Sequence, residues 1–436
     1  MSTETVRLLT LDPGHFHAAL VQKEMYEGVS PEVHVYAPLG PDVVSHLHRI
    51  IGFNTRKQNP TSWHLEVHAG SDYRQLFLRD RPGNVVVLAG RNHLKIHYIL
   101  EALQAGINVL ADKPWIITAD DLPRLQAALD HAERSELIAY DIMTERHEIT
   151  SILQRELVND PAIFGVPVAG TVTEPAVEMA SMHYLSKSVA GVPLRRPPWF
   201  FDVEQQGEGL TDVGTHLVDL VFWILFPEES IDYRSDIRIV AAKRWPTVLT
   251  KSDFQKVTGE AEFPEYLAPQ LRSGELSYFC NTLVSYTVRG TYVQLDIRWD
   301  YEAAPGSGDT HSAVFRGSQS AVEIRQEKEQ NYRPELYVLP CRPGDKPGVL
   351  AAVQRKIDAL RPRYPDLTVE PEGDRLHVVI PEKYRIGHEA HFAEVTRQFL
   401  GYLRQPKSSP AWEKSVMLAK YYVTTQGVAV ARQLSV

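Results

Sequence analysis

The stretch that decides the fold is Ile107-Asn108-Val109-Leu110-Ala111-Asp112-Lys113-Pro114. Its apolar, β-branched start predicts a buried strand that ends in an acid, a lysine and a proline. A helical stretch, residues 94–105, precedes it and is closed by Gly106, and an earlier strand covers residues 84–89. The order strand, helix, strand predicts a βαβ unit. Lys113 then lies at the carboxyl end of a parallel strand, where open α/β sheets bind their ligands.

Outward from this unit, strands and helices alternate over the first part of the chain. Further strands are expected at residues 6–11, 32–36, 63–67 and 137–140, and helices at 15–25, 73–79 and 121–134. Such alternation predicts an α/β fold in which residues 1–142 form a Rossmann-type, doubly wound parallel sheet that binds a dinucleotide.

The pattern changes after residue 142. A bridging helix is expected at residues 145–158, and closing helices at 391–403 and 412–428. Between them, alternating apolar and polar residues predict strands at 166–173, 237–242, 276–288, 293–299, 313–316, 321–325, 336–339, 367–370 and 377–380. Residues 243–274 show little periodicity and are expected to form an irregular insertion. We therefore expect residues 143–436 to form an α+β domain with a large, mostly antiparallel sheet for substrate binding and oligomerisation.

A second stretch, residues 209–219, carries side chains suited to proton transfer. Asp212, His216 and Asp219 stand at positions i, i+4 and i+7, which share one face of a helix. Asp212 would lie in the first turn, where the helix dipole favours its ionised form. A histidine beside an oriented carboxylate can accept a hydroxyl proton. An ordinary capped amphipathic helix explains the same spacing, and Lys113 alone could be a surface lysine.

The loop after the first strand departs from a common cofactor motif. A dinucleotide fold normally carries Gly-x-Gly-x-x-Gly there, whereas this chain has Asp12-Pro13-Gly14-His15-Phe16-His17. Gly14 keeps the glycine that lets the backbone approach a pyrophosphate, but His17 replaces the one that permits close packing. The helix start still offers N–H groups to an anion, and His15 or His17 could add a donor. A His-x-His pair in a loop can equally be structural.

Composition excludes several classes of protein. The net charge of −9 argues against a nucleic-acid or anionic-membrane partner. Two cysteines imply no disulfide framework, and residues 1–7 show no signal-peptide pattern. The most apolar stretch, residues 217–226, is too short to span a bilayer. We expect a cytoplasmic protein.

Three stretches together resemble one family. Asp112-Lys113-Pro114 is similar to the Glu-Lys-Pro motif of the glucose–fructose oxidoreductase/inositol dehydrogenase (Gfo/Idh/MocA) family. Residues 209–219 resemble its second signature, a glycine-rich lead into Asp-x-Gly-x-His-x-x-Asp, and residues 102–110 resemble the helix-to-strand passage between them. The closing stretches, residues 387–392 and 417–422, are similar to a branch with its own C-terminal oxidoreductase domain.

This resemblance implies an NAD(P)-dependent dehydrogenase that moves a hydride between a nicotinamide and a hydroxyl-bearing carbon of a sugar, polyol or glycoside. Lys113 would stabilise the reacting oxygen, and a cis peptide bond between Lys113 and Pro114 would orient its side chain. His216 would be the general base. Asp212 would bind a substrate hydroxyl or orient His216, and Asp219 would support the site or form a salt bridge.

The resemblance also assigns binding residues. The cofactor would contact Gly14, His15, Phe16, Asn92, Asp112 and Lys113, and the substrate would contact Lys113, Arg146, His183, Asp212 and His216. Asn92 matches the family's Thr-Pro-Asn-x-x-His, whose histidine is Lys95 here. Arg146 could instead be a charge on a helix face. His183, with Tyr184 and Trp199 in the loop at residues 182–201, could line a sugar pocket or pack internally.

Several alternatives stay open. NAD is expected from the family, but residues 35–38 offer neither an acid nor an arginine to distinguish NAD from NADP. No metal is expected, because His388 and His391, one helical turn apart, lack a third ligand at recognisable spacing. The family favours a homodimer or homotetramer. The other functions considered are a glycoside-processing enzyme with a tightly bound, recycled NAD, and a non-catalytic ligand sensor.

Overall fold

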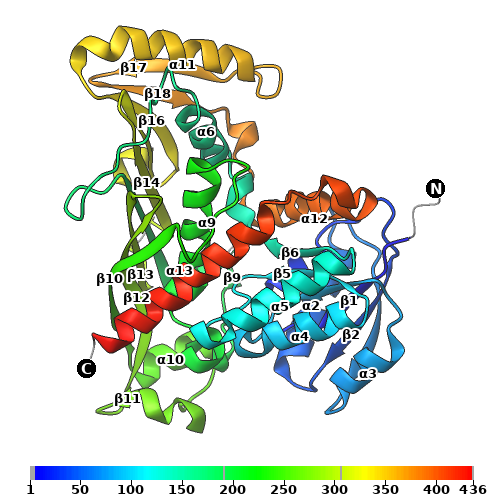
Figure 1. The fold of residues 1–436 in the computed structure, drawn as a ribbon. Helices are drawn as coiled ribbons and strands as arrows, with labels where there is room; N and C mark the ends of the chain where they lie inside the picture. The colour runs from blue at the N-terminus through cyan, green and yellow to red at the C-terminus, as the bar shows by residue number, and fades with distance from the viewer. Residues whose placement is uncertain (1–4, 190–191, 305–306, 435–436) are drawn as a thin grey trace.

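The protein contains two sheets with helices between and around them (Figure 1). The computed structural model describes residues 5–189, 192–304 and 307–434. The first sheet is parallel throughout, in the order β3-β2-β1-β4-β5-β6. Its strands are β1 (Leu8–Leu11), β2 (Glu32–Ala37), β3 (His64–Ala69), β4 (Val85–Leu88), β5 (Asn108–Asp112) and β6 (Ala139–Ile142). The predicted Rossmann-type sheet is confirmed.

Alternate strand residues point into two different cores, as the period of two in a strand requires. Leu9 and Val86 pack with α4 (Asn92–Gln104) and α5 (Leu122–Arg134). Leu8 and Val85 pack on the opposite face. There the covering helices are α1 (His17–Leu20), α2 (Pro41–Thr55) and, from the far end of the chain, α12 (His388–Arg404). The first sheet is therefore covered partly by a helix from beyond residue 142.

The second sheet has ten strands in the order β10-β12-β13-β7-β14-β15-β16-β18-β17, with β11 paired to β12. Every described pairing is antiparallel except that of β13 with β7. The strands are β7 (Val177–Ser186), β10 (Ile237–Leu249), β11 (Leu271–Arg272), β12 (Glu275–Val288), β13 (Thr291–Glu302), β14 (Thr310–Arg316), β15 (Ser320–Arg325), β16 (Glu335–Pro340), β17 (Thr368–Glu372) and β18 (Arg375–Val379). The predicted large, mostly antiparallel sheet is confirmed.

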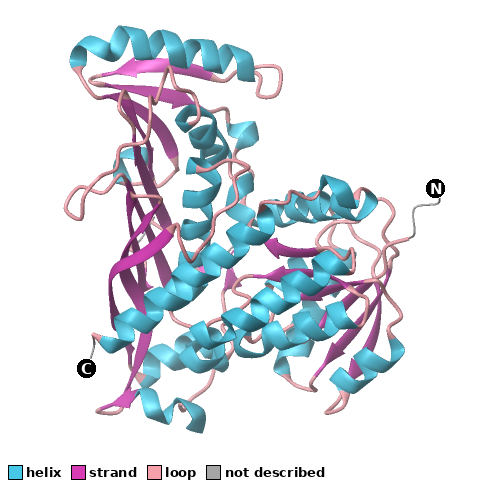
Figure 2. Cartoon of the chain, viewed as in Figure 1, coloured by secondary structure: helices cyan, strands magenta, loops and turns pink. Residues whose placement is uncertain are grey.

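Long helices separate this sheet from the first one (Figure 2). They are α6 (Ile149–Val158), α9 (Gly214–Leu225) and α13 (Glu413–Gln433), and their apolar residues join one core with the inner sides of the strands. The remaining elements are α3 (Tyr73–Asp80), α7 (Val203–Gln206), α8 (Gly209–Asp212), α10 (Lys251–Thr258), α11 (Lys346–Leu360) and the short pair β8 (Ser188–Val189) and β9 (Val192–Pro193). Among the described residues, no helix is both long and apolar enough to cross a membrane.

Two sequence predictions in this half are wrong. Residues 166–173 form a loop with isolated bridges, and the strand is β7, which follows it. Residues 243–274 are ordered: β10 continues to Leu249, and α10 follows with Thr250 as a capping residue. The strand extension was not predicted because Pro246 interrupts it, and a proline is tolerated inside a strand mainly at a bulge. Such an irregularity is present, because the pairing with β12 shifts register between Trp245 and Thr247.

Candidate active site

Lys113 and Asp212 form the centre of the site. Lys113 follows β5, its peptide bond to Pro114 is cis, and its side chain is buried. Its Nζ lies 2.5 Å from Asp212 Oδ1 and 3.3 Å from the Asp212 carbonyl oxygen. The two motifs, about a hundred residues apart in the chain, therefore converge at the carboxyl edge of the parallel sheet.

The helix that carries Asp212 and His216 is broken, contrary to prediction. Asp212 ends the single turn α8, and α9 begins at Gly214. Gly209 lies against β12, where a Cβ atom would stand 1.8 Å from the Cys280 carbonyl oxygen, so only glycine fits. Burial alone would raise the pKa of Asp212, but the adjacent Lys113 ammonium overrides it and holds that pKa well below its usual range.

His216 lies near this ion pair with one ring nitrogen unused. Its Nδ1 is buried and has no hydrogen-bond partner. Burial, and then the positive charge of Lys113, lowers the pKa of His216 to about 3. The spacing suggested that the Asp212 carboxylate would orient the His216 imidazole. In the structure it accepts a hydrogen bond from Lys113. His216 is accordingly a neutral hydrogen-bonding group in the absence of substrate.

Two histidines of the first loop converge on Asp112. His17 Nδ1 lies 2.8 Å from Asp112 Oδ2, and His15 Nδ1 lies 3.8 Å from the same oxygen. Burial, followed by the neighbouring histidines, lowers the pKa values of both His15 and His17 well below 6.5. The position of the motif's third glycine is thus filled by an imidazole that contacts the end of β5.

Several backbone N–H groups of the same loop, which would bind a pyrophosphate, donate hydrogen bonds within the protein. The N–H of His15 donates to Ala89 O (2.9 Å), that of Gly14 to Asp12 O (2.8 Å), and that of His17 to His15 Nδ1 (3.4 Å). In the ordinary Rossmann mode these groups face the phosphates. The loop as it stands does not present that cradle.

Trp199 covers the glycine that would face the pyrophosphate. A Cβ atom on Gly14 would stand 3.1 Å from the indole of Trp199, whose Nε1 donates to Asp42 Oδ2 at 3.0 Å. Arg91 lies beneath the indole and bonds to Asp42 at 3.2 Å. The pocket that includes Gly14, His15 and Phe16 holds about 200 Å³, below the roughly 300–1,000 Å³ of small-molecule sites. The residues at the phosphate end therefore do not fit ordinary dinucleotide binding.

Two predicted binding residues have other roles. Asn92 donates to the carbonyl and side-chain oxygens of Gln206 and accepts from Lys95 Nζ at 2.7 Å, so it holds α4 against α7. Its expected cofactor contact stays a prediction. Arg146 is buried and binds both oxygens of Asp219 (2.6 and 2.7 Å) as well as Glu413. Asp219 is therefore the salt-bridge partner of Arg146, as one alternative proposed, and the substrate contact of Arg146 stays a prediction.

His183 projects from β7 toward the same region. Its Nδ1 lies 3.1 Å from Asp309 Oδ2, its Nε2 lies 2.6 Å from Ser181 Oγ, and its ring packs on Trp299. His183 is close enough to Asp212 to lower the pKa of that carboxyl. Ser181 was missed in the sequence because its strand was missed. Its spacing of two from His183 is the signal that could have revealed it.

Glu145 and His388 complete the polar surroundings. His388 Nδ1 lies 3.3 Å from Glu145 Oε1, and the His388 ring lies 5.7 Å from that of His17. Burial alone would raise the pKa of Glu145, but His388 lowers it well below its usual range. The sequence singled out His388 but offered no means of pairing it with Glu145.

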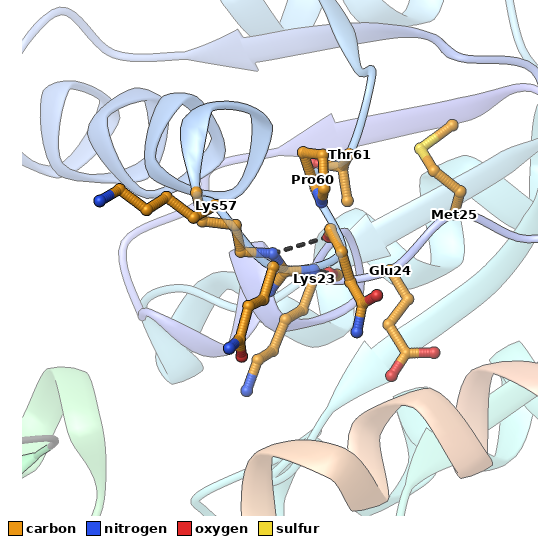
Figure 3. Close-up of a pocket in the computed structure, with 9 residues that line it drawn as sticks. Lys23, Glu24, Met25, Lys57, Pro60 and Thr61 are labelled. Atoms are coloured by element: carbon orange, nitrogen blue, oxygen red, sulfur yellow. Dashed lines mark hydrogen bonds between the residues drawn. The ribbon is translucent and has the colours of Figure 1, made fainter.

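A larger pocket of about 910 Å³ lies elsewhere, lined by residues that include Lys23, Lys57 and Thr61 (Figure 3). These residues precede β2 and β3, so they belong to the amino-terminal edge of the parallel strands, opposite the edge that carries Lys113. Open α/β sheets bind ligands at the other edge. Volume alone therefore does not locate the active site.

The fold is that of a Rossmann-type α/β protein with a second, large and mostly antiparallel sheet. The family described as "Putative oxidoreductase C terminal domain" matches residues 153–432, and the chain belongs to it. This match confirms the predicted branch with its own C-terminal oxidoreductase domain. The Lys113 and Asp212 motifs resemble those of the Gfo/Idh/MocA oxidoreductases.

Similar solved structures cover nearly the whole chain. A "putative oxidoreductase" from Parabacteroides merdae is 45% identical, with a TM-score of 0.96 over 99% of this chain and 98% of that one. A levoglucosan dehydrogenase in complex with NADH and L-sorbose is 14% identical (TM-score 0.60; 98% and 97% covered). A "putative myo-inositol dehydrogenase" from Sinorhizobium meliloti is 13% identical (TM-score 0.56; 99% and 98% covered). The last two show a shared fold. No curated protein matches the chain.

Proposed function

We propose that this chain is an NAD(P)-dependent dehydrogenase that acts at a hydroxyl-bearing carbon of a sugar, polyol or glycoside. The observation that carries the proposal is the buried Lys113–Asp212 pair beside the unpartnered Nδ1 of His216. A fixed ammonium next to a free imidazole nitrogen provides two hydrogen-bonding groups for one substrate hydroxyl.

Lys113 has the stronger part in this arrangement. Asp212 fixes its ammonium, which can donate to the reacting oxygen and stabilise the negative charge that develops there. Neutral His216 can accept the hydroxyl proton, but the nearby Lys113 charge disfavours the imidazolium. We therefore assign His216 to orienting the hydroxyl and receiving its proton only as negative charge forms on the oxygen.

The nicotinamide, when bound, supplies the hydride chemistry. NAD is favoured by the family, and the end of β2 (Glu32–Ala37) offers no carboxylate that would exclude NADP. Because the phosphate end of the cleft does not fit ordinary binding, cofactor binding is to be measured separately from turnover. Equilibrium titration with NAD, NADH, NADP and NADPH should show binding of at least one of them.

Turnover should be followed at the reduced-nicotinamide absorbance with a panel of sugars, polyols and glycosides. Lys113→Ala and His216→Ala should each reduce kcat/KM at least roughly 100-fold, because each removes a group on the reacting oxygen. Lys383→Ala, which removes an exposed lysine paired with Asp366, is the matched control and should leave turnover unchanged. Full activity in both site variants would contradict the proposal.

A second function is favoured by the packing of Trp199 on Gly14. A phosphate loop that departs from the ordinary binding mode in this way would be tolerated if the nicotinamide cofactor were held by other contacts, retained, and recycled during glycoside cleavage or epimerisation. Native mass spectrometry of the purified chain should then show bound nucleotide, and a glycoside should release its aglycone without net reduction of added NAD. From the family resemblance we also propose a homodimer or homotetramer, which light scattering can test.

A further inference from the structure

We propose that His15, His17 and Asp112 bind a divalent transition-metal ion, Zn²⁺ being the best match. The three ligand atoms, two Nδ1 nitrogens and Oδ2, all lie within 4.8 Å of one another. Zinc bonds to histidine and carboxylate are about 2.0–2.2 Å long, so such atoms stand roughly 3–4 Å apart around one ion. The distances of 2.8 and 3.8 Å to Asp112 Oδ2 are close to that range.

The ligands come from two neighbouring elements that hold them in place. His15 lies in the turn after β1 and His17 begins α1, and the backbone of the turn is tied to the end of β4 through the His15–Ala89 hydrogen bond. Asp112 ends β5, which is paired on both sides. The ring of Phe392, from α12, packs on His17 at 4.6 Å. These contacts fix the ligand geometry before an ion binds.

The burial pattern matches that of a reactive metal site. His17 and Asp112 are buried at 7% and 4% exposure, whereas His15 is half-buried. Structural zinc sites are closed by four protein ligands, and catalytic sites use three and leave a position for water or substrate. Two histidines and one carboxylate provide the catalytic number, with His15 on the accessible side.

The local charges permit a cation. Two ammonium groups lie near Asp112 and both are engaged. Lys113 is paired with Asp212 at 2.5 Å, and Lys95 donates to Asn92 Oδ1 and to the Asp112 carbonyl oxygen. His388, which faces His17, is paired with Glu145. Only one of the three motif glycines is present in this loop, and several of its backbone N–H groups donate within the protein. The loop therefore offers fewer groups to an anion, and its two histidines are possible cation ligands. The His17–Asp112 contact alone could be a hydrogen bond, which is the alternative that the test must exclude.

An ion here would serve as a Lewis acid. A substrate with two neighbouring oxygens, such as a vicinal diol or hydroxyketone, could place one oxygen on the ion and the other on the ammonium of Lys113, the residue after Asp112. This inference replaces the sequence expectation of no metal. The metal site does not depend on the proposed redox function, because the experiment that tests it measures cation binding.

The full-length protein, freed of metal with a chelator, should be titrated with Zn²⁺ by calorimetry and with Co²⁺ by its visible absorption. We expect one strong site per chain. His17→Ala and Asp112→Asn should each weaken binding roughly 100-fold or more, since loss of a group that only hydrogen-bonds to a ligand already costs about 10–100-fold. His15→Ala, at a half-buried position, gives a ligand-loss variant for the case in which His17→Ala does not fold.

The chain provides its own control cluster. His34, Glu66 and His68 also bring three ligand atoms together, at the edge of the sheet formed by β2 and β3, with Glu66 exposed. His68→Ala should leave the strong site unchanged. Anomalous scattering from a zinc-soaked crystal should place the ion between His15, His17 and Asp112. The proposal is overturned if no stoichiometric binding occurs, or if His68→Ala abolishes it while His15→Ala and His17→Ala do not.

Discussion

A single lysine sets the electrostatics of the site. Lys113 lowers the pKa of Asp212 by ion pairing and contributes to the low pKa of His216 by repulsion. Both effects act through the same ammonium, so removing it should reverse both of them. The proton-accepting strength of His216 is thus set first by its burial and second by the charge of its neighbour.

Lys113→Met should raise the pKa of His216 from about 3 toward, but not up to, its ordinary value of about 6.5, because burial remains. NMR titration of the His216 ring protons measures this shift. Lys383→Met, which removes a distant exposed lysine, should leave the His216 titration unchanged. An unaltered pKa in the Lys113 variant would show that its charge does not act on this imidazole.

Asp12 is a second residue whose charge matters. It is buried with a φ of 48°, and burial, opposed by Arg91, raises its pKa from 3.8 to about 6. The folded state therefore binds this proton more tightly than the unfolded state does. Stability from this group falls as the pH rises from about 4 to 6, and the loss persists above pH 6.

Asp12→Asn should remove that loss, since asparagine carries no charge and tolerates positive φ. We expect the free energy of unfolding to rise at pH 7.5 by up to about 3 kcal/mol, the equivalent of the pKa change. At pH 4 the variant and the original protein should be nearly equal. Urea unfolding at both pH values measures the difference, and a less stable variant at pH 7.5 would contradict the assignment.

At the scale of elements, the sequence predicts those strands whose inward side chains are apolar. β1, β4 and β5 are such strands, and each lies within a residue or two of its expected position. β7 was missed because its inward positions include Ser181 and His183, so the polar residues of the site interrupt the alternation. A strand that carries polar site residues on its inward face therefore lacks the apolar–polar alternation by which strands are predicted.

The residues of the site also divide into those that the sequence predicts and those that it does not. Lys113 and Asp212 were placed together because each stands in a local motif, and their contact follows from the family arrangement. The contact of His17 with Asp112, the cover of Trp199 over Gly14 and the ion pair of Arg146 depend on the packing of distant segments. No local spacing encodes such contacts, so the sequence alone could not supply them.

Helix α12 shows how distant segments complete an element. Phe399 is 1% exposed and packs in the core beneath the first sheet. Phe399→Ala should reduce the free energy of unfolding by about 3–5 kcal/mol, because it removes a buried ring and leaves a cavity. Urea unfolding measures the loss. Ile386→Ala, just before the helix and 42% exposed, is the control and should change stability by less than about 1 kcal/mol. Similar stability for both variants would show that α12 does not anchor the sheet.

At the scale of the whole molecule, a buried ionic network joins the first sheet to helices α9 and α13, which pack against the second sheet. Lys420 of α13 is fully buried, and its Nζ lies 3.0 Å from Asp141, which is in the first sheet, and 3.0 Å from Asp219 of α9. Arg146 binds Asp219 as well, and Tyr421 donates to Asp141 at 2.6 Å. Removing one member leaves an uncompensated charge in the interior, which is costly even where the intact network contributes little net stability.

Lys420→Met should therefore destabilise the protein by about 3–5 kcal/mol near neutral pH. The loss should shrink in acid, because Asp141, whose pKa burial already raises, can then take up a proton and no longer brings a bare charge into the core. Lys414→Met removes a surface lysine paired with Asp130 and Glu133 and should cost no more than about 1 kcal/mol. Urea unfolding at pH 7.5 and pH 5 tests both variants. Equal losses for Lys420→Met at the two pH values would mean that the cost lies in packing, and that charge balance does not hold the two sheets together.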